Sequence, residues 1–476
     1  MNLSIRQIAD ACGGRLVIKK AAQEVQVSCV VIDSRQIETD GVFVATVGER
    51  VDGHKFIGQV YEKGAALVIT EKTPEQVEKE CDVPVTAWGS YLVVENSFQA
   101  LKDIAEVYRK TLDIPVVGIT GSVGKTSTKE FIAGVLAEKY TVLKTEGNYN
   151  NEIGVPLTLL RIRENHQAAV VEMGISDFGE MHRLSKMVRP NVCVITNIGQ
   201  CHLENLKTRD GILQAKTEIF DFMAPDGEVC LNGEDDKLQT VEQVHGKQTH
   251  FFGLGGFSGE EVYADNIRSK GLWGSDATLH FVLNGLEERE DIQVPLPGVH
   301  MVINAAAAAC VGKQLGLNSQ QIKEGISKVA AVAGRNHLIR LESSTLIDDC
   351  YNANPVSMKA AIDLLSMADT EKIAILGDMF ELGENSDSMH AEVGAYAAKH
   401  EIDKIYCVGT NSGHMYEAAL KAAEQTAQVF YFETLEALLD ALKQNREKWI
   451  PKGCTVLIKA SHGMKFTQVV DCLKEE

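Results

Sequence analysis

A glycine-rich turn followed by a lysine and two hydroxyl residues carries the clearest chemistry in this sequence. Residues 120–127 read Thr-Gly-Ser-Val-Gly-Lys-Thr-Ser. Glycines let backbone N–H groups fold around phosphate oxygens, Lys125 can reach a terminal phosphate, and Thr126 can ligate magnesium. The turn therefore predicts a nucleotide phosphate-binding loop. The residues expected to contact the nucleotide here are Gly121, Ser122, Val123, Gly124, Lys125, Thr126 and Ser127.

The flanking segments predict the elements that hold this loop. Residues 115–120 are apolar and β-branched, which favours a buried strand, whereas apolar residues recur at helical spacing over 131–136. The spacing departs from the usual phosphate loop, because Ile119 stands where that pattern has its first glycine. A glycine-rich turn alone is often a simple connection, but Lys-Thr at the start of a helix favours nucleotide binding.

Two further polar residues follow predicted strands. Glu172 ends the apolar segment 168–172, and His202 follows the segment 192–197. Open parallel sheets present their ligand-binding groups at the carboxyl ends of strands, and magnesium prefers oxygen ligands. Glu172 alone could be a solvated carboxylate and His202 a structural histidine. Beside a phosphate loop, we interpret Glu172 as a magnesium ligand.

Length, charge and cysteine content limit the kinds of protein that this chain can be. A chain of 476 residues suggests two to four domains. The net charge of −19 with scattered basic residues argues against an extended nucleic-acid-binding surface and favours a small partner. Eleven cysteines without a Cys-Xaa-Xaa-Cys pair favour reduced thiols and a cytoplasmic protein. We expect no targeting segment and no membrane insertion.

Strand and helix patterns alternate along most of the chain, which predicts an α/β protein with parallel sheets. We expect three domains with boundaries at 1–95, 96–333 and 334–476, and a helical connector over 97–111. Segment 253–294 reads as irregular or antiparallel structure. The other expected elements are strands 41–47, 65–70, 345–348, 372–377, 404–408 and 455–458 and helix 54–63.

The motif Thr-Gly-Ser-Xaa-Gly-Lys-Thr resembles the phosphate-loop motif of the ATP-dependent Mur ligases. These enzymes join amino acids or peptides to a nucleotide-linked muramoyl precursor of the bacterial cell wall. Further segments match in family order over nearly the whole chain. The resemblance implies a small N-terminal domain that binds the UDP end of the acceptor, a central ATP-binding domain, and a Rossmann-like C-terminal domain. The last would close on ATP across a cleft and bind the amino substrate.

The same resemblance assigns the metal site. It implies two magnesium ions held near Thr126, Glu172 and His202, with His202 helping to organise the second ion. It also implies that carbon dioxide carbamylates Lys216, so that a carboxylate-like group supports magnesium. From the residues alone, 215–220 reads as an amphipathic helix with an exposed lysine.

Three residues outside the phosphate loop are also expected to contact ATP. By resemblance, Asn304 reaches the adenine, Arg335 the phosphates and Asp349 the ribose hydroxyls. An amide offers the donor and acceptor of a purine edge, and a guanidinium matches a phosphate. A packed alanine-rich helix around Asn304 and a buried salt bridge at Asp349 or Arg335 are the competing interpretations.

The segments 147–154, 349–355, 377–383 and 459–464 resemble the members that add D-alanyl-D-alanine to a UDP-muramoyl tripeptide. The Asp-Asn-Pro-Arg signature of members adding meso-diaminopimelate is absent from the sequence. Arg35 could equally be a surface salt-bridge partner. The residues expected to bind substrate are Ser34, Arg35, Asn150, Asn151, Tyr351, Asn352 and Asn354.

The resemblance implies an ADP-forming ligase that works through an acyl phosphate, with UDP-N-acetylmuramoyl-tripeptide and D-alanyl-D-alanine as substrates in a monomeric protein. The third residue of the acceptor peptide and the base that deprotonates the attacking amine stay open. A sister ligase adding a single amino acid, including a relative of folylpolyglutamate synthase, is one alternative. Another is a nucleotide-dependent switch or transport ATPase, which would hydrolyse ATP without an acceptor.

Overall fold

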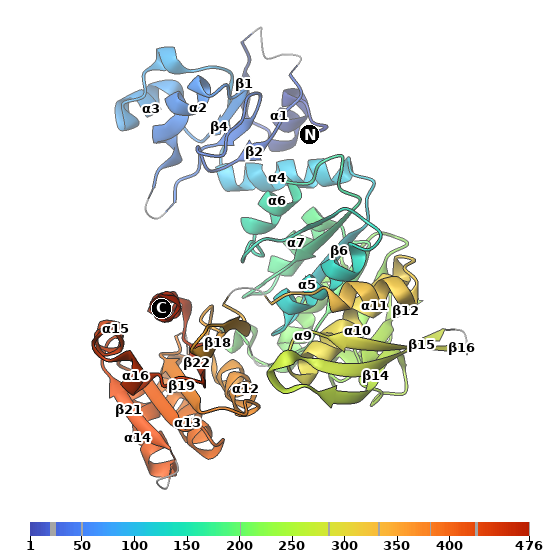
Figure 1. The fold of residues 1–476 in the computed structure, drawn as a ribbon. Helices are drawn as coiled ribbons and strands as arrows, with labels where there is room; N and C mark the ends of the chain where they lie inside the picture. The colour runs from blue at the N-terminus through green and yellow to red at the C-terminus, as the bar shows by residue number, and fades with distance from the viewer. Residues whose placement is uncertain are drawn as a thin grey trace. The chain divides into compact units, whose positions relative to one another are not determined.

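The computed structural model describes residues 1–19, 25–48, 51–199, 201–283, 286–331, 334–380, 382–423 and 427–475. The chain divides into two compact units (Figure 1). The first comprises Met1–Asp265, Thr278–Ile292 and Val302–Lys328, and the second comprises Asn266–Ala277, Gln293–Met301 and Val329–Glu476. The expected boundary at residue 333 falls outside the described residues.

The N-terminal part of the first unit is a five-stranded sheet with the order β1-β5-β4-β3-β2. Strand β1 is antiparallel to β5, and the other neighbouring pairs are parallel. The strands are β1 (Arg15–Val17), β2 (Val30–Val31), β3 (Val42–Val44), β4 (Leu67–Thr70) and β5 (Tyr91–Val93). The helices are α1 (Ile5–Cys12), α2 (Ile57–Glu62) and α3 (Pro74–Cys81), with short 3-10 turns at Gly53–Phe56 and Val85–Ala87. The predicted helix 54–63 is thus a 3-10 turn continued by α2.

The rest of the first unit is built on a nine-stranded sheet with the order β16-β15-β14-β13-β10-β9-β6-β8-β7. The neighbouring pairs from β7 to β14 are parallel. The strands are β6 (Val116–Thr120), β7 (Val142–Lys144), β8 (Ala168–Glu172), β9 (Val192–Ile195), β10 (Glu228–Asn232), β13 (His250–Gly253), β14 (Glu260–Ser269), β15 (Ser275–Leu283) and β16 (Leu286–Val294). Segment 253–294, expected to be irregular or antiparallel, supplies three long strands and joins the sheet through a parallel pair.

Helices accompany this sheet in the alternation expected of a parallel α/β fold. They are α4 (Ser97–Lys110), α5 (Lys125–Leu136), α6 (Gly154–Leu159), α7 (Glu180–Val188), α8 (Leu203–Leu206), α9 (Arg209–Thr217), α10 (Val299–Gln314) and α11 (Ser319–Ser327). Short 3-10 turns occur at Glu218–Phe220 and Leu238–Thr240, and β11 (Gln243–Val244) pairs with β12 (Lys247–Gln248) as a separate ribbon.

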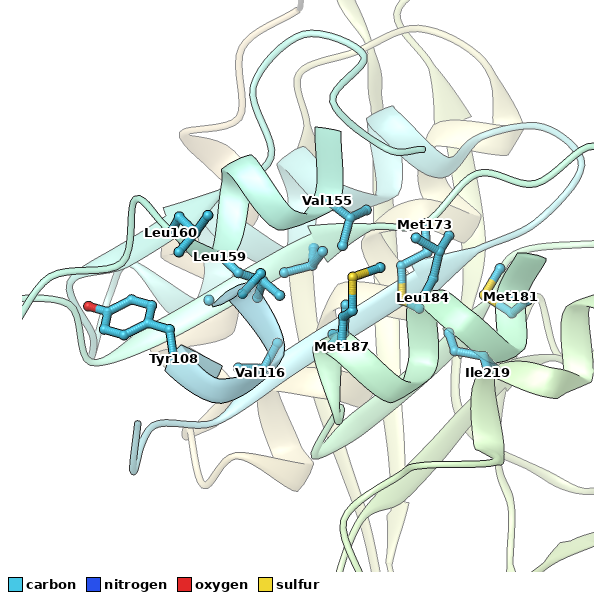
Figure 2. Close-up of a cluster of buried hydrophobic side chains, with 14 of the residues drawn as sticks. Tyr108, Val116, Val155, Leu159, Leu160, Met173, Met181, Leu184, Met187 and Ile219 are labelled. Atoms are coloured by element: carbon cyan, nitrogen blue, oxygen red, sulfur yellow. The ribbon is translucent and has the colours of Figure 1, made fainter. Parts of the chain in front are cut away.

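A methionine-rich cluster packs between these helices and the sheet (Figure 2). Met181, Leu184 and Met187 of α7 and Val155 and Leu159 of α6 belong to this cluster, and all are buried. Every residue of β6, β8 and β9 is buried as well, as expected for central strands covered on both faces. The loops that follow β6, β8 and β9 therefore start from a rigid layer.

The second unit contains a six-stranded sheet with the order β17-β18-β22-β19-β20-β21. Only the β17–β18 pair is antiparallel among its described pairs. The strands are β17 (His337–Arg340), β18 (Ser344–Asp348), β19 (Lys372–Gly377), β20 (Lys404–Val408), β21 (Gln428–Phe432) and β22 (Cys454–Lys459). The helices are α12 (Pro355–Ser366), α13 (Ser386–Lys399), α14 (Ser412–Ala422), α15 (Leu435–Gln444), α16 (Arg446–Trp449) and α17 (Thr467–Lys474), with 3-10 turns at Gly271–Trp273, Gly383–Asn385 and His462–Met464.

Consecutive residues of β19 alternate between two hydrophobic cores. Ala374 and Leu376 belong to one cluster, whereas Ile373 and Ile375 belong to the other. Because successive side chains of a strand point to opposite faces, helices cover both faces of this sheet. The expected doubly wound C-terminal fold is confirmed. Within the described residues, no helix combines the length and apolar character needed to cross a bilayer.

Candidate functional site

The predicted phosphate loop connects β6 to α5, and its two glycines are required by its geometry. Gly121 has φ 149°, and a Cβ placed there would lie 1.9 Å from Thr196 Oγ1. Gly124 has φ 82° and caps the N-terminus of α5 in the left-handed region. Gly121 has no space for a side chain, and the positive φ of Gly124 disfavours one there. The loop places Lys125, Thr126 and Ser127 on the first turn of a helix whose N-terminus attracts anions.

The carboxyl end of β9 fixes the shape of this loop. Asn197 accepts from the Ser122 N–H through its carbonyl (3.1 Å) and from the Val123 N–H through its side chain (3.0 Å). The Asn197 amide and the Thr196 hydroxyl both donate to the Val123 carbonyl, at 3.0 and 2.6 Å. Sequence reasoning missed the role of Asn197, although its position directly after a strand was a usable signal.

Thr126 and Glu172 meet in a buried cluster of oxygen atoms. The Thr126 hydroxyl donates to Glu172 Oε2 at 2.9 Å, and the Asn150 amide donates to Glu172 Oε1 at 2.9 Å. Glu172 is 1% exposed, and it forms no ion pair with any residue that the structure describes. A buried carboxylate without a cationic partner is costly, so this site suits a bound cation. Asn150, expected to bind substrate, is hydrogen-bonded to this carboxylate.

A second buried connection, not anticipated from the sequence, holds Glu172 in place. The Glu172 N–H donates to Thr145 Oγ1 at 3.0 Å, and the Lys129 ammonium donates to the Thr145 carbonyl at 2.7 Å. Lys129 and Thr145 are both buried. Lys129 lies one helical turn after Lys125 on α5, so Thr145 links the phosphate-loop helix to the strand end that carries Glu172.

Lys216 is buried rather than exposed, which makes the exposed-lysine interpretation wrong. It lies on α9 with 1% of its surface exposed. Burial, followed by the positive charge of Lys125, lowers the pKa of Lys216 to about 7. Lys125 itself donates to the Gly121 carbonyl at 2.8 Å. The apolar periodicity of α9 correctly indicated a helix but not how deeply the lysine lies.

Cys201 and His202 continue the segment that follows β9. The Cys201 thiol donates to the Ser122 hydroxyl at 3.1 Å, so this segment contacts the phosphate loop. His202 has φ 50°, and its carbonyl accepts from the Leu206 N–H at 2.9 Å at the start of α8.

A cavity of about 620 Å³ opens beside these groups, and His202 forms part of its wall. Of the residues expected in the site, it is lined by Lys125, Asn150, Asn151 and His202. The Asn151 side chain also accepts from the Ile153 and Gly154 N–H groups, at 3.1 and 2.9 Å, and shapes the turn before α6. The sequence did not indicate the other residues that line the cavity, which are Phe98, Lys102, Glu152, Ile153, Gly174, Ile175, Ser176 and Glu180.

Ser34 and Arg35 follow β2 in the five-stranded sheet and do not line this cavity. The Arg35 side chain is 86% exposed and pairs with Asp33 at 2.7 Å, which lowers the pKa of Asp33. Ser34 is buried, and its carbonyl accepts from the Lys63 ammonium at 2.9 Å. The surface salt bridge weighed for Arg35 is present.

Asn304 lies next to the phosphate loop on α10. The Thr128 hydroxyl donates to Asn304 Oδ1 at 3.0 Å, and that oxygen is 3.7 Å from the position a Cβ on Gly124 would occupy. Asn304 and Thr128 are thus in contact although they are 176 residues apart in the sequence.

In the second unit, Asp349 takes part in a buried salt bridge. Lys459 Nζ lies 2.5 Å from Asp349 Oδ2 and also donates to the Asn352 carbonyl at 2.9 Å. The Arg335 guanidinium stacks on the Tyr351 ring at 4.3 Å. Arg335 follows Gly334, and Asp349, Tyr351 and Lys459 lie at or just after the ends of β18 and β22. The fold therefore brings these four side chains together at one edge of the sheet.

The two asparagines expected to bind substrate in this unit serve local structure. The Asn354 side chain accepts from the Ser357 N–H at 2.8 Å and caps α12. Asn352 Oδ1 accepts from the Ala353 N–H at 2.8 Å. Each amide oxygen therefore already has a hydrogen-bond donor.

The loop after β19 is held by side chains from three other segments. His390 is fully buried, and its Nε2 accepts from the Met379 N–H at 2.9 Å. Ser461 Oγ accepts from the Phe380 N–H at 2.9 Å, and Asp378 Oδ1 accepts from the Ser412 N–H at 2.7 Å. These contacts present the Phe380 side chain, which is 43% exposed, at the same edge of the sheet.

Comparison with known proteins connects this arrangement to one family. Models of the Mur ligase family match in three parts: the catalytic domain over residues 26–120, the middle domain over 119–312 and the glutamate ligase domain over 334–462. The UDP-N-acetylmuramoyl-tripeptide--D-alanyl-D-alanine ligase of Bacillus subtilis is 35% identical over 476 residues, covering 99% of this chain and 98% of that protein. The Escherichia coli enzyme of the same name is 31% identical, covering 100% and 99%.

Solved structures agree with these sequence matches. A crystal structure of MurF from Acinetobacter baumannii superposes with a TM-score of 0.86 at 31% identity, covering 99% of both chains. MurF from Thermotoga maritima in complex with ADP has a TM-score of 0.77 at 27% identity, covering 95% of this chain and 98% of that one.

Proposed function

The chain belongs to the Mur ligase family, and from this membership and the geometry above we propose how its own residues carry out the family's reaction. It is an ATP-dependent, ADP-forming ligase that adds D-alanyl-D-alanine to UDP-N-acetylmuramoyl-tripeptide in peptidoglycan precursor synthesis. The site assignment rests on one arrangement: Thr126 of the phosphate loop contacts the buried Glu172, and Lys125 of the same loop lines the cavity.

We assign the three substrates to successive parts of the chain. Residues 1–95, with Ser34 and Arg35, would hold the UDP end of the acceptor, residues 96–333 would hold ATP, and residues 334–476 would bind D-alanyl-D-alanine. Asn304 would contact adenine, Arg335 the phosphates and Asp349 the ribose. Tyr351, Asn352 and Asn354 would bind the dipeptide, the two asparagines through groups outside their local hydrogen bonds.

The described residues fit magnesium. The Thr126 hydroxyl, the Glu172 carboxylate and the Asn150 amide lie together, and the carboxylate forms no ion pair within the described chain. Thr126 and Glu172 would hold one ion, and His202 and a modified Lys216 would support a second. Magnesium bound there would supply positive charge to phosphate oxygens.

Lys216 fits carbamylation because its amine is largely available in the neutral form. A pKa of about 7 leaves roughly half of the lysine uncharged at pH 7. The neutral amine would add to carbon dioxide, forming an N–C bond and releasing one proton, and the product would carry a negative charge. That charge would offset the positive charge of Lys125, which is the nearest cation lowering the pKa of Lys216.

In the reaction, the tripeptide carboxylate attacks the γ-phosphorus of ATP and ADP departs, which leaves an acyl phosphate. Lys125 would stabilise the charge that develops on the transferred phosphoryl oxygens. The amine of D-alanyl-D-alanine then attacks the acyl carbon, phosphate leaves, and the amine loses a proton. The cavity would hold the reacting carboxylate near Lys125 and reduce its contact with water.

All the residues in this proposal come from one chain, so it requires no second subunit. We also place the protein in the cytoplasm, which its eleven free cysteines support.

The test is phosphate release from Mg-ATP with UDP-muramoyl tripeptide and D-alanyl-D-alanine, with L-lysine and meso-diaminopimelate as competing amines and identification of the conjugate by mass. Turnover with the dipeptide is expected. Thr126→Val should lose activity, whereas Thr126→Ser, which keeps the hydroxyl, should retain most of it. Acceptor-independent hydrolysis would support the ATPase alternative, and ligation of a single amino acid would support a sister ligase.

A further inference from the structure

The cavity beside Lys125 must receive the third residue of the acceptor peptide. The carboxylate that is activated belongs to that residue, and it has to approach the γ-phosphate, to which we have assigned Lys125. The side chain of the same residue is attached one carbon away and therefore extends into the space next to Lys125. At about 620 Å³, the cavity has the size of a typical small-ligand site.

Two residues of the cavity wall, Lys102 and Glu152, belong to an ion-pair network. Lys102 of α4 lies 3.1 Å from Glu152 Oε1, and Arg183 of α7 lies 2.6 Å from the same oxygen. Arg183 also donates to Glu152 Oε2 at 3.3 Å. One carboxylate thus faces two cations, and the trio carries a net positive charge.

Three further carboxylates interact with the trio: Asp103 with Lys102, and Glu180 and Glu218 with Arg183. Glu180 lines the cavity, but its carboxylate accepts from the Ser176 N–H at 2.6 Å and sits at the N-terminus of α7. These donors and the helix dipole already stabilise the Glu180 charge. Burial by itself would raise the pKa of Glu152, but hydrogen bonds from Arg183 and Lys102 lower it, so Glu152 is ionised.

From this placement we propose that Lys102 is a specificity-determining residue that binds a second carboxylate at the distal end of the third residue, so that the acceptor is a tripeptide ending in meso-diaminopimelate rather than L-lysine. Both residues bear an ammonium group on the same distal carbon, and diaminopimelate adds a carboxylate there. The carboxylate would pair with Lys102 and the ammonium with Glu152. A lysine side chain would offer the same ammonium but no carboxylate for Lys102 to bind.

The inference rests on the ligase activity and is tested by comparing two acceptors. The kcat/KM of the natural chain is measured with UDP-muramoyl tripeptides ending in meso-diaminopimelate or L-lysine, at fixed ATP and D-alanyl-D-alanine. A charge-assisted hydrogen bond predicts a preference for diaminopimelate of about 10- to 100-fold. Lys102→Met should reduce this ratio to near 1, mainly through KM, and Lys102→Arg should retain much of it.

A matched control comes from the same helix. Lys110 of α4 pairs with Glu106 at 2.6 Å and does not line the cavity. Lys110→Met should leave the preference of the natural chain unchanged.

Two results would overturn the inference while leaving the ligase function intact. They are equal or better use of the lysine tripeptide by the natural chain, and an equal loss with both acceptors in Lys102→Met. Ligation of neither peptide would reject the ligase function itself, and the inference with it.

Discussion

A pair of glutamates beside β13 and β14 makes the stability of this protein depend on pH. Glu260 begins β14, is 6% exposed and has a buried Oε1 without a hydrogen-bond partner. A Cβ on Gly253 would lie 2.2 Å from that oxygen and 2.9 Å from Glu234 Oε1, so the two carboxylates are close together. Burial raises the pKa of Glu260 to about 7. A hydrogen bond from the Gly255 N–H opposes this shift, and the negative charge of Glu234 adds to it.

The direction of the effect follows from proton linkage. Between the ordinary value of 4.5 and about 7, the folded chain keeps a proton on Glu260 that the unfolded chain loses. The folded state is therefore favoured below this window, and its stability falls as pH rises through it. The full difference corresponds to at most about 3 kcal/mol, with solvent access reducing it.

Replacing Glu260 by glutamine imitates the protonated carboxyl and should remove this loss. We expect Glu260→Gln to match the natural chain near pH 4.5 and to be more stable by about 1 to 3 kcal/mol at pH 8.5. Urea denaturation followed by circular dichroism at a series of pH values measures the difference. Glu242→Gln, at an exposed glutamate, is the control. Parallel pH curves for the natural chain and Glu260→Gln would refute the reasoning.

Three other substitutions test the site. Gly121→Ala places a methyl group 1.9 Å from Thr196 Oγ1 and should weaken ADP binding by about 100-fold or more in calorimetry. Gly58→Ala, whose Cβ would lie no closer than 3.7 Å to another residue, should leave the affinity unchanged, and unchanged affinity in Gly121→Ala would contradict the loop geometry. Thr145→Val leaves the Glu172 N–H unpaired and should raise the magnesium concentration for half-maximal activity about tenfold, whereas Thr145→Ser should not; a loss of thermal stability alone would indicate a structural role. Lys216→Met removes a buried amine, so we expect equal or higher thermal stability with at least about a 100-fold loss of ligation, and retained ligation would argue against a role for Lys216.

Local patterns in the sequence were sufficient for much of the fold. Strands 168–172, 372–377 and 404–408 begin and end as predicted, because each is a short apolar run flanked by turn residues. The strand, glycine turn and helix of the phosphate loop also form as expected. Strands β17 and β21 were missed, since their residues are half-buried or exposed and lack a continuous apolar run.

Contacts between distant segments could not be predicted in the same way. Lys102 and Glu152 are 50 residues apart and meet through the packing of α4. The periodicity of α9 gave the helix but not the burial of Lys216. The asparagines show a related limit, because residue type alone does not distinguish the cap at Asn354 or the carboxylate contact of Asn150 from substrate binding.

The hydrogen bonds between Asn197 and the phosphate loop bear on how such loops can diverge. A loop whose curvature is held by the neighbouring strand does not need a glycine at its first position, although Gly121 and Gly124 remain necessary. Ile119 can therefore occupy that first position within the fully buried β6. Searches for distant nucleotide-binding proteins could therefore pair a relaxed loop pattern with a Thr-Asn dipeptide after the adjacent strand. The same logic suggests that a designed loop gains tolerance to substitution when its supporting contacts are moved to a second strand.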